Sequence, residues 1–371
     1  MDINPGLASG FFLHFCFKYC VMNRLIIVLI LGLMLTSTWS QGISLLSDSS
    51  KASFTLTGFA DMYFGKQRGN FAQKPSFVYN HRVNNQLRTN LLLLKGEFQL
   101  SRFRATLGLM TGDYSRYNLA AEPLWARPLN EAFCGVKILK KANLWWDVGV
   151  YNSFIGLESA ISSDAPTLTR SIVSDNTPYY FLGTRTLYVS ENKNHELGFH
   201  VLNGWQRIAL DPKMRRPSFG VHYKVHFSER FSLMYGAFYG SIYPDSLSIG
   251  RFYQHVNLAW NKGKWEQWGT VDVGVESDYL WAAGQWMTRY AFNKHWSLAQ
   301  RIEVFYDPNN RCARIGAQKA TVLGSMTLCP SYQWTESLVL RLEPKYLIAT
   351  ETIFKGEAWS WQLNAGIGVR I

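Results

Sequence analysis

The stretch GEAWSWQLNAGIGVRI, from Gly356 to Ile371, alternates in side-chain character almost without exception. Apolar residues occupy the odd-numbered positions from Trp359 onwards, and polar or small residues occupy the even-numbered ones. A period of two indicates a β-strand with one apolar face and one polar face. Strands of soluble proteins usually have about 5–6 residues, so a strand of this length favours a closed barrel that crosses a membrane.

The same alternation recurs along the chain and predicts sixteen strands. Bacterial barrels made from a single chain have an even number of strands. We therefore predict an all-β fold, a transmembrane antiparallel up-and-down β-barrel of about 16 strands. The expected strands are 52–65, 86–101, 102–111, 129–139, 143–152, 182–191, 195–203, 218–228, 230–241, 251–261, 264–276, 279–292, 296–306, 321–333, 336–347 and 358–371.

The connections between the expected strands are alternately short and long. Every second connection is a tight polar turn, such as Asn261–Lys264. Short periplasmic turns and long extracellular loops are typical of outer-membrane barrels. The connection near Ser277 should be long and is not, so either a strand prediction there is wrong or that loop is shortened. The expected long loops are 66–85, 112–128, 153–181, 204–217, 242–250, 307–320 and 348–357.

Charged residues occur at alternate positions of several expected strands, opposite the apolar residues. A charge in a membrane strand is tolerated only where it faces water or another charge. We therefore expect these residues to face the lumen and to set the electric field of a channel. A static ladder of ion pairs that braces the wall is the alternative. The candidate lumen-lining charges are Lys95, Glu97, Arg102, Arg104, Arg301, Glu303, Arg341, Glu343 and Lys345.

Composition supports the same fold class. Aromatic residues make up 15% of the chain and charged residues 17%, against about 25% charged residues in average soluble domains. Aromatic residues near strand ends, such as Trp145, Trp265 and Trp334, suit the girdles at the two membrane interfaces. The formal net charge is +12, but the basic residues are scattered singly along the strands. A nucleic-acid partner is therefore not expected.

The N-terminal region contains one apolar run, Leu25–Leu35, which is too short to span a bilayer as a helix. It follows Arg24 and precedes Thr38 and Ser40, small residues at the −3 and −1 positions of a cleavage site. This arrangement predicts a signal peptide over 22–40 if translation begins at Met22. Residues 1–21 are then an upstream extension from a mis-called start; a genuine long leader is the alternative. A periplasmic lead-in, 41–51, precedes a barrel over 52–371.

No pattern of catalytic, nucleotide-binding or metal-ligating residues stands out. The eight histidines are dispersed, so we expect no cofactor, no metal and no enzymatic activity, with a barrel hydrolase as a minor alternative. His222 and His226 share one strand face but lie about 13 Å apart along it, too far to chelate one ion. Cys312 and Cys329 flank one expected hairpin, and either a disulfide or two free thiols fits that position.

Four stretches resemble the outer-membrane beta-barrel porins of the OmpL-like family. They are the opening strand Phe54–Tyr63, the segment Asn130–Lys137, the segment Gly149–Glu158 that enters a long loop, and the strand end Val201–Trp205. The resemblance covers most of the mature chain and implies an outer-membrane barrel that lets small solutes diffuse passively. It supplies no catalytic residues. The terminal Ile371 departs from the aromatic residue on which many such barrels end.

These observations predict a porin-like channel in the outer membrane of a Gram-negative bacterium, passing small hydrophilic solutes or ions. We expect the 153–181 loop to fold inward and narrow the lumen, because a long loop in a compact barrel is usually functional. The alternatives are a barrel that acts through its surface loops as an adhesin or binding protein, a plugged structural barrel and, last, a soluble sandwich. The expected partners are outer-membrane lipid, solutes or ions, the barrel assembly machinery and further copies of the chain.

Overall fold

The computed structural model describes residues 43–44, 52–313, 315 and 321–371. The predicted upstream extension (1–21) and signal peptide (22–40) lie outside these residues, as does most of the lead-in 41–51. Within the described part of the chain, no helix is long and apolar enough to cross a membrane.

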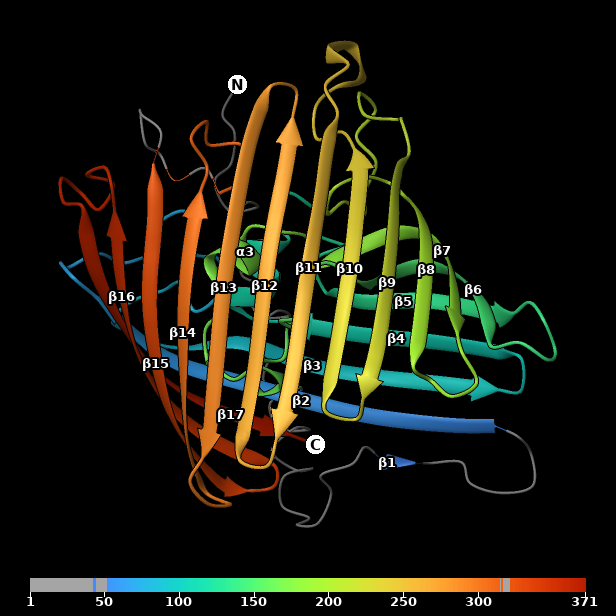
Figure 1. Ribbon diagram of the computed structural model, residues 1–371, viewed down its shortest axis with the longest axis horizontal. Helices are drawn as coiled ribbons and strands as arrows, with labels where there is room; N and C mark the ends of the chain where they lie inside the picture. The colour runs from blue at the N-terminus through green and yellow to red at the C-terminus, as the bar shows by residue number, and fades with distance from the viewer. Residues whose placement is uncertain (1–42, 45–51, 314, 316–320) are drawn as a thin grey trace, which may run out of the picture.

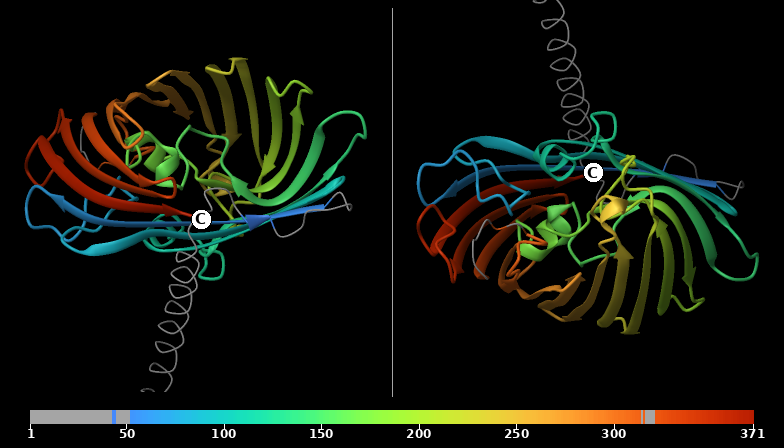
Figure 2. Two further views of the ribbon diagram at one scale, coloured as in Figure 1. Left: turned by 90° about the horizontal axis from the view of Figure 1, so that it is seen from below. Right: turned by 90° about the horizontal axis from the view of Figure 1, so that it is seen from above.

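The described strands form one antiparallel sheet of 17 strands, in which the two-residue β1 pairs only with β2. The other sixteen make a closed wall, because β17 pairs with β2 and β9 pairs with β10 (Figures 1 and 2). The strands are β1 (Ile43–Ser44), β2 (Ala52–Gln67), β3 (Leu87–Leu100), β4 (Phe103–Thr111), β5 (Leu129–Lys137), β6 (Leu144–Asn152), β7 (Tyr180–Val189), β8 (His195–Leu202), β9 (Ser218–Ser228), β10 (Phe231–Gly240), β11 (Arg251–Lys262), β12 (Trp265–Glu276), β13 (Tyr279–Ala291), β14 (Trp296–Tyr306), β15 (Val322–Thr335), β16 (Leu338–Ala349) and β17 (Trp359–Arg370).

The predicted barrel of sixteen antiparallel strands is confirmed, and every strand end lies within two residues of its expected position. The short connection near Ser277 is a shortened loop. There β12 and β13 are joined by a two-residue turn, Ser277–Asp278, in which Ser277 has a left-handed φ of 52°. Both flanking strand predictions are therefore correct.

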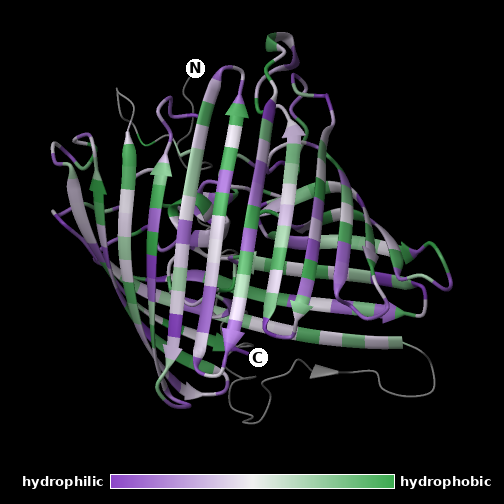
Figure 3. Ribbon diagram, in the orientation of Figure 1, coloured by the Kyte–Doolittle hydropathy of each residue, from purple (hydrophilic) through white to green (hydrophobic). Residues whose placement is uncertain are grey.

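The wall turns its apolar side chains outward. In β16 the apolar Leu340, Leu342 and Tyr346 are exposed, whereas the intervening Arg341 and Glu343 are buried. Figure 3 shows the same alternation of hydropathy along strands all around the barrel. A soluble protein would bury the apolar face, so this polarity is that of a barrel surrounded by lipid.

The pairing of β15 with β16 has a gap in the middle of the two strands. Paired positions run from Leu323↔Ala349 to Thr327↔Lys345 and resume at Ser331↔Arg341. Pro330 and Pro344 both lie within the gap, and neither has a backbone N–H to donate across it. Pro344 lies inside β16, where this gap interrupts the ladder.

The interior of the barrel contains α3 and part of the loop chain (Figures 1 and 2). The loop between β6 and β7, residues 153–179, carries η1 (Ser162–Asp164) and α3 (Ile172–Asp175). Elsewhere α2 (Asp113–Asn118) follows β4 and η2 (Asp245–Leu247) follows β10. The largest buried hydrophobic cluster combines wall residues with residues of this loop, so the core of the protein lies in the lumen.

Candidate functional site

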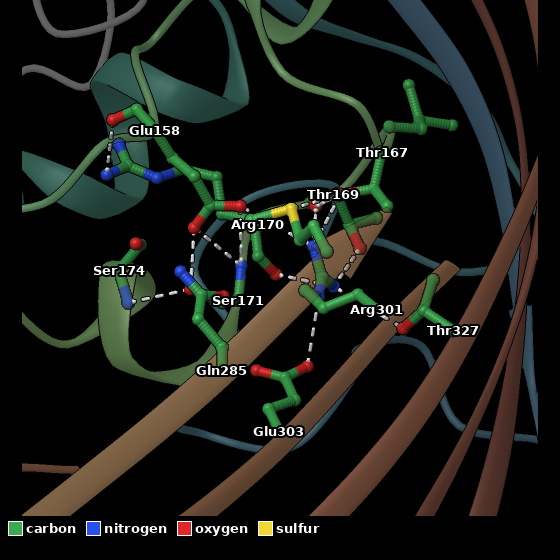
Figure 4. Close-up of polar contacts among 12 residues, drawn as sticks. Glu158, Thr167, Thr169, Arg170, Ser171, Ser174, Gln285, Arg301, Glu303 and Thr327 are labelled. Carbon is green, nitrogen blue, oxygen red and sulfur yellow. Dashed lines mark hydrogen bonds and ion pairs between the residues drawn. The ribbon is translucent and has the colours of Figure 1, made fainter. Parts of the chain in front are cut away.

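Residues 153–179, called here the inward loop, lie inside the barrel. Leu168, Ile172 and Val173 of this loop are at most 4% exposed. Figure 4 shows the loop lying against the strand that carries Arg301 and Glu303, β14. The prediction that the long loop after β6 folds inward is therefore confirmed.

Glu343 of β16 holds the middle of the inward loop. Its carboxylate accepts backbone N–H bonds from Leu168 at 2.7 Å and from Thr169 at 3.0 Å, and it also accepts the Thr169 hydroxyl. Hydrogen bonds to an ionised group are the stronger kind, and Glu343 is fully buried. The contact fixes a loop that is 174 residues distant in sequence.

Arg301 of β14 binds the same part of the loop from the neighbouring side. One terminal nitrogen donates to the Thr167 hydroxyl and to the Thr169 carbonyl, both at 2.6 Å. The other donates to the Arg170 carbonyl at 3.1 Å (Figure 4). Arg301 also forms an ion pair with Glu158 at 3.5 Å. The guanidinium has no exposed surface, so its donors serve the loop and neighbouring side chains rather than water.

Glu303 of β14 is hydrogen-bonded to the first residue of α3. Its carboxylate accepts the Ile172 N–H at 2.6 Å and the Ser325 hydroxyl at 2.5 Å. It also forms ion pairs with Arg301 at 3.2 Å and with Lys345 at 3.0 Å. The bond satisfies a backbone N–H at the N-terminus of α3 that has no partner within the helix, and it fixes this end of the inward loop.

Arg341 of β16 completes the attachment by donating to the carbonyls of Ser162 at 2.8 Å and of Thr167 at 3.1 Å. We call the five wall residues Arg301, Glu303, Arg341, Glu343 and Lys345 the latch. Together with Glu158 of the loop they carry three positive and three negative formal charges. Buried charges are tolerated when they are paired and hydrogen-bonded. Arg301, Glu303 and Lys345 are linked by ion pairs, whereas Glu343 and Arg341 are held by hydrogen bonds to the loop, and Arg341 Nε is buried without a hydrogen-bond partner.

The remaining predicted charges belong to β3 and to the start of β4, away from the latch, and are more exposed. Lys95 and Glu97 form an ion pair at 3.3 Å, with side-chain exposures of 23% and 47%. Lys95 also lies 3.6 Å from Glu131. Lys95 and Glu131 border a cleft of about 160 Å³ between the inward loop and the β3–β6 part of the wall, which is also lined by Glu158 and Arg170 among others.

Arg104 and Arg102 differ although they lie two positions apart. Arg104 forms a bidentate pair with Asp147 at 2.8 and 2.7 Å, and Arg185 donates to the same carboxylate at 2.7 Å. Arg102 precedes β4 in an exposed turn and donates to the Lys137 carbonyl at 2.6 Å. The structure thus gives Arg102 a role in bracing neighbouring turns, because β4 begins only after it.

Large aromatic side chains form a band around the lumen, which we call the aromatic collar. Phe154 of the inward loop stacks on Phe181 with centroids 5.3 Å apart, and Tyr253 stacks on Trp281 at the same spacing. All except Phe154 have at most 1% of their surface exposed. The collar residues are Phe154, Phe181, Phe238, Tyr253, Trp281 and Phe305.

Two glycines make room for the collar on the wall. A β-carbon at Gly274 would lie 2.1 Å from the Trp281 ring, and one at Gly220 would lie 2.6 Å from the Phe154 ring. Both approaches are closer than van der Waals contact allows. Any larger residue at these positions would therefore displace the ring.

A chain of hydrogen bonds lies beside Phe154. The ring nitrogens of His200 and His222 are 2.9 Å apart, and His222 reaches Glu196 at 3.1 Å. Phe154 stacks on His200 with a centroid separation of 4.4 Å. The sequence singled out His222 with His226 on one strand, but its partner His200 lies on the neighbouring strand. Across the described part of the chain, no cluster of three or more potential ligands could hold a metal ion.

The two cysteines for which a disulfide was considered are free thiols in the structure. The thiol of Cys312 donates to the Asn176 carbonyl of the inward loop at 3.4 Å. Cys329 is fully buried beside Ser331 of its own strand. Of the two alternatives left by the sequence, the structure has the free thiols.

Comparison with known proteins gives a family and a set of similar barrels. The family model described as "Putative beta-barrel porin-2, OmpL-like" matches residues 53–362. OmpF of Salmonella typhi is 11% identical, with a TM-score of 0.62 over 89% of this chain and 100% of that one. The outer membrane channel DcaP of Acinetobacter baumannii is 10% identical, with a TM-score of 0.57 and the same coverage. An anion-selective porin from Comamonas acidovorans is also 10% identical, with a TM-score of 0.56 over 86% and 100%. No curated protein sequence matches this chain.

Proposed function

We propose that small hydrophilic solutes or ions diffuse passively through this protein. The chain belongs to the OmpL-like family of beta-barrel porins and is thus an outer-membrane channel protein. The observation that carries this proposal is the position of the inward loop. It is attached to one side of the lumen by the latch and leaves a polar cleft on the other side. A cleft between a loop and a charged wall can select solutes by size and charge.

The size of the cleft limits what passes while the loop stays in place. Its volume is about 160 Å³, which has room for several waters and suits small ions or solutes. Lys95, Glu131 and Arg170 supply charges of both signs along its border.

Single-channel recording of the purified full-length chain in planar bilayers tests the proposal. We expect stable stepwise openings of small conductance, with a reversal potential in a salt gradient set by the charges that border the cleft. Replacing residues 159–170 by a short Gly-Ser linker should increase the step size, because this segment includes most of the loop's contacts with the latch. A folded, heat-modifiable barrel that gives no steps would contradict the channel proposal.

A plugged barrel that acts through its surface loops is a second candidate. The observation that favours it is the aromatic collar, whose buried rings fill the lumen from several strands. This candidate predicts no conductance in either the full-length chain or the latch variants described below. Step openings in a latch variant alone would instead indicate a channel that opens only when the loop is released.

We also propose that the chain is exported with cleavage after Ser40, that the barrel assembly machinery inserts residues 52–371, and that the barrel forms homo-oligomers. The long loops would then lie outside the cell and the short turns in the periplasm. N-terminal sequencing of outer-membrane protein should give Gln41 as the first residue, and light scattering in detergent should give a multiple of the chain mass. No catalytic activity is assigned.

A further inference from the structure

A second cavity, of about 780 Å³, opens at the long-loop end of the barrel. It lies between the β2–β3 loop, 68–86, and the β16–β17 loop, 350–358, and no residue of the inward loop lines it. Cavities of about 300–1,000 Å³ are typical of small-molecule sites. The cavity is therefore large enough for a solute and is separate from the cleft.

The lining of this cavity is cationic. It contains the three cationic side chains Arg68, Lys74 and Lys355, and one carboxylate, Glu357. Glu357 is already engaged by Arg68 at 2.9 Å. Two positive charges remain when these four are summed, so the electrostatic field of the cavity favours an anion.

Lys74 is the deepest of these cations and is only 3% exposed. Its ammonium donates to the His81 carbonyl and to the Asn364 side-chain oxygen. An ammonium has three donors, and no carboxylate of the described residues lies within 4.0 Å of it. Burial lowers the pKa of Lys74 to about 7; the charge of Lys345 acts in the same direction, while those of Glu343 and Asp175 oppose the shift.

The other side of the cavity is apolar. Phe77 and Phe354 meet edge to face with centroids 6.4 Å apart, and Phe71 lies nearer the opening with 37% of its surface exposed. Aromatic surface of this kind binds the apolar part of a ligand. The cavity therefore offers a cationic floor and an aromatic wall to the same molecule.

We propose that this cavity is a binding site for a small organic carboxylate with an apolar body, whose carboxylate pairs with the Lys74 ammonium on the cationic side of the lining. The inference deepens the proposed function and rests on it, because it names the class of solute that the channel would collect at its mouth. The aromatic residues select the apolar body, and the floor selects the charge.

Calorimetric titration of the full-length chain in detergent tests the site with three probes. Benzoate carries both features, benzamide has the ring without the charge, and inorganic phosphate has the charge without the ring. We expect benzoate to bind on the order of tenfold more tightly than either of the others, because each lacks one set of contacts. Equal binding of benzamide would overturn the role of the cationic floor, and equal binding of phosphate would overturn that of the aromatic wall.

Two variants place the binding in this cavity. Lys74→Gln keeps a hydrogen-bonding side chain but removes the charge, so benzoate binding should weaken on the order of tenfold. Phe71→Ala alters an exposed residue and should weaken benzoate binding without affecting phosphate. Lys262→Gln, in a turn at the other end of the barrel, is the matched control and should change nothing. Benzoate binding that is unchanged in folded Lys74→Gln and in Phe71→Ala would overturn the inference.

The pH dependence gives a further readout. An anion binds the protonated form of Lys74, so benzoate affinity should be highest below a pH of about 7 and should fall above it. A pH-independent affinity would contradict a role for Lys74. Bilayer recordings separate the two proposals. Step openings without benzoate binding would support the channel and contradict the binding site. Benzoate binding without step openings would support the binding site and contradict the channel.

Discussion

On the β14–β16 side of the inward loop the charges of the wall are buried and bonded to the loop, whereas on the β3–β6 side they are partly exposed and border the cleft. Arg301 and Glu343 have no exposed surface, while the side chains of Lys95 and Glu97 are 23% and 47% exposed. Both sets alternate with lipid-facing residues in the same way. The comparison teaches that the pattern of a strand fixes the face of a charge but not whether that charge meets water or protein.

The two sets of charges should also contribute differently to the free energy of unfolding. A buried charge that loses its partner is strongly destabilising, whereas an exposed pair contributes about 0–1 kcal/mol. We therefore expect changes at the latch to alter stability and loop position together. Changes at the cleft should alter ion selectivity and leave the fold intact. The predictions below test that division in order of decreasing effect on stability.

Arg301→Met should have the largest effect. It removes the donors to Thr167 and Thr169 and leaves Glu158 and Glu303 with fewer partners. Breaking a buried pair in this way costs about 3–5 kcal/mol, and the released loop should give larger conductance steps. Unfolding in urea and single-channel recording measure the two effects.

The control for Arg301→Met is Arg102→Met, because Arg102 lies in an exposed turn outside the lumen. It should lower stability by less than about 1 kcal/mol and leave conductance unchanged. If Arg301→Met retained both the stability and the step size of the wild type, the latch would not hold the loop.

Phe154→Ala should have the next largest effect, because it removes the one collar ring that the inward loop contributes. The ring stacks on Phe181 and on His200, and truncating a buried Phe to Ala costs about 3 kcal/mol or more. Gly220→Ala provides a second route, since the added β-carbon would meet the Phe154 ring at 2.6 Å.

Both collar variants should destabilise the barrel and loosen the loop, as measured by urea unfolding and by protease sensitivity within 153–179. Phe219→Ala, on the neighbouring lipid-facing position of β9, is the control. A Gly220→Ala protein as stable as the wild type would show that the ring is free to move, which would argue against a packed collar.

Ser171→Ala should have a smaller effect confined to the start of α3. The Ser171 hydroxyl accepts the Ser174 N–H at 3.1 Å and donates to Glu158 at 2.5 Å. Loss of such a helix cap costs about 1 kcal/mol. Ser171→Thr keeps the hydroxyl and should restore the wild-type midpoint in urea; equal loss in both variants would mean that the cap is not the cause.

The strands could be predicted from the sequence because their side chains repeat every two residues over long segments. The same period placed Arg301 and Glu343 on the inner face. It could not show that they bind the inward loop, because the Leu168 N–H and the Glu343 carboxylate that meet are 175 residues apart. Only the path of the loop through the lumen brings them together.

The aromatic collar and the pair His200 and His222 could also not be predicted from the sequence, for a related reason. Phe238 and His222 are buried inside the barrel, and their neighbours come from other strands. His200 meets His222 across a hairpin whose register depends on the long connection 203–217. The loop length does not fix that register, whereas the short turns at the other end do fix theirs. Arg102 was misplaced because β4 starts one residue later than expected.

Substitutions on the cleft side should affect stability least and selectivity most. Lys95→Gln removes a positive charge and Glu131→Gln a negative one from the border of the same cleft. The Lys95 side chain is 23% exposed, so Lys95→Gln should change stability by less than about 1 kcal/mol. Glu131 is buried, at 7% exposure, and Glu131→Gln serves as the charge change of opposite sign. A unit charge about 6 Å from an ion in water changes its energy by about 0.7 kcal/mol, or about threefold in relative permeability.

The two cleft substitutions should therefore move the reversal potential in a potassium chloride gradient in opposite directions. Lys95→Gln should favour cations and Glu131→Gln should favour anions, because each leaves the other charge less compensated. Their opposite signs are the internal control, since a general distortion of the loop would move both variants the same way. Shifts of equal sign, or a shift in Arg102→Met as large as these, would mean that ions do not pass along the cleft, and the distinction between a packed side and a conducting side would then fail.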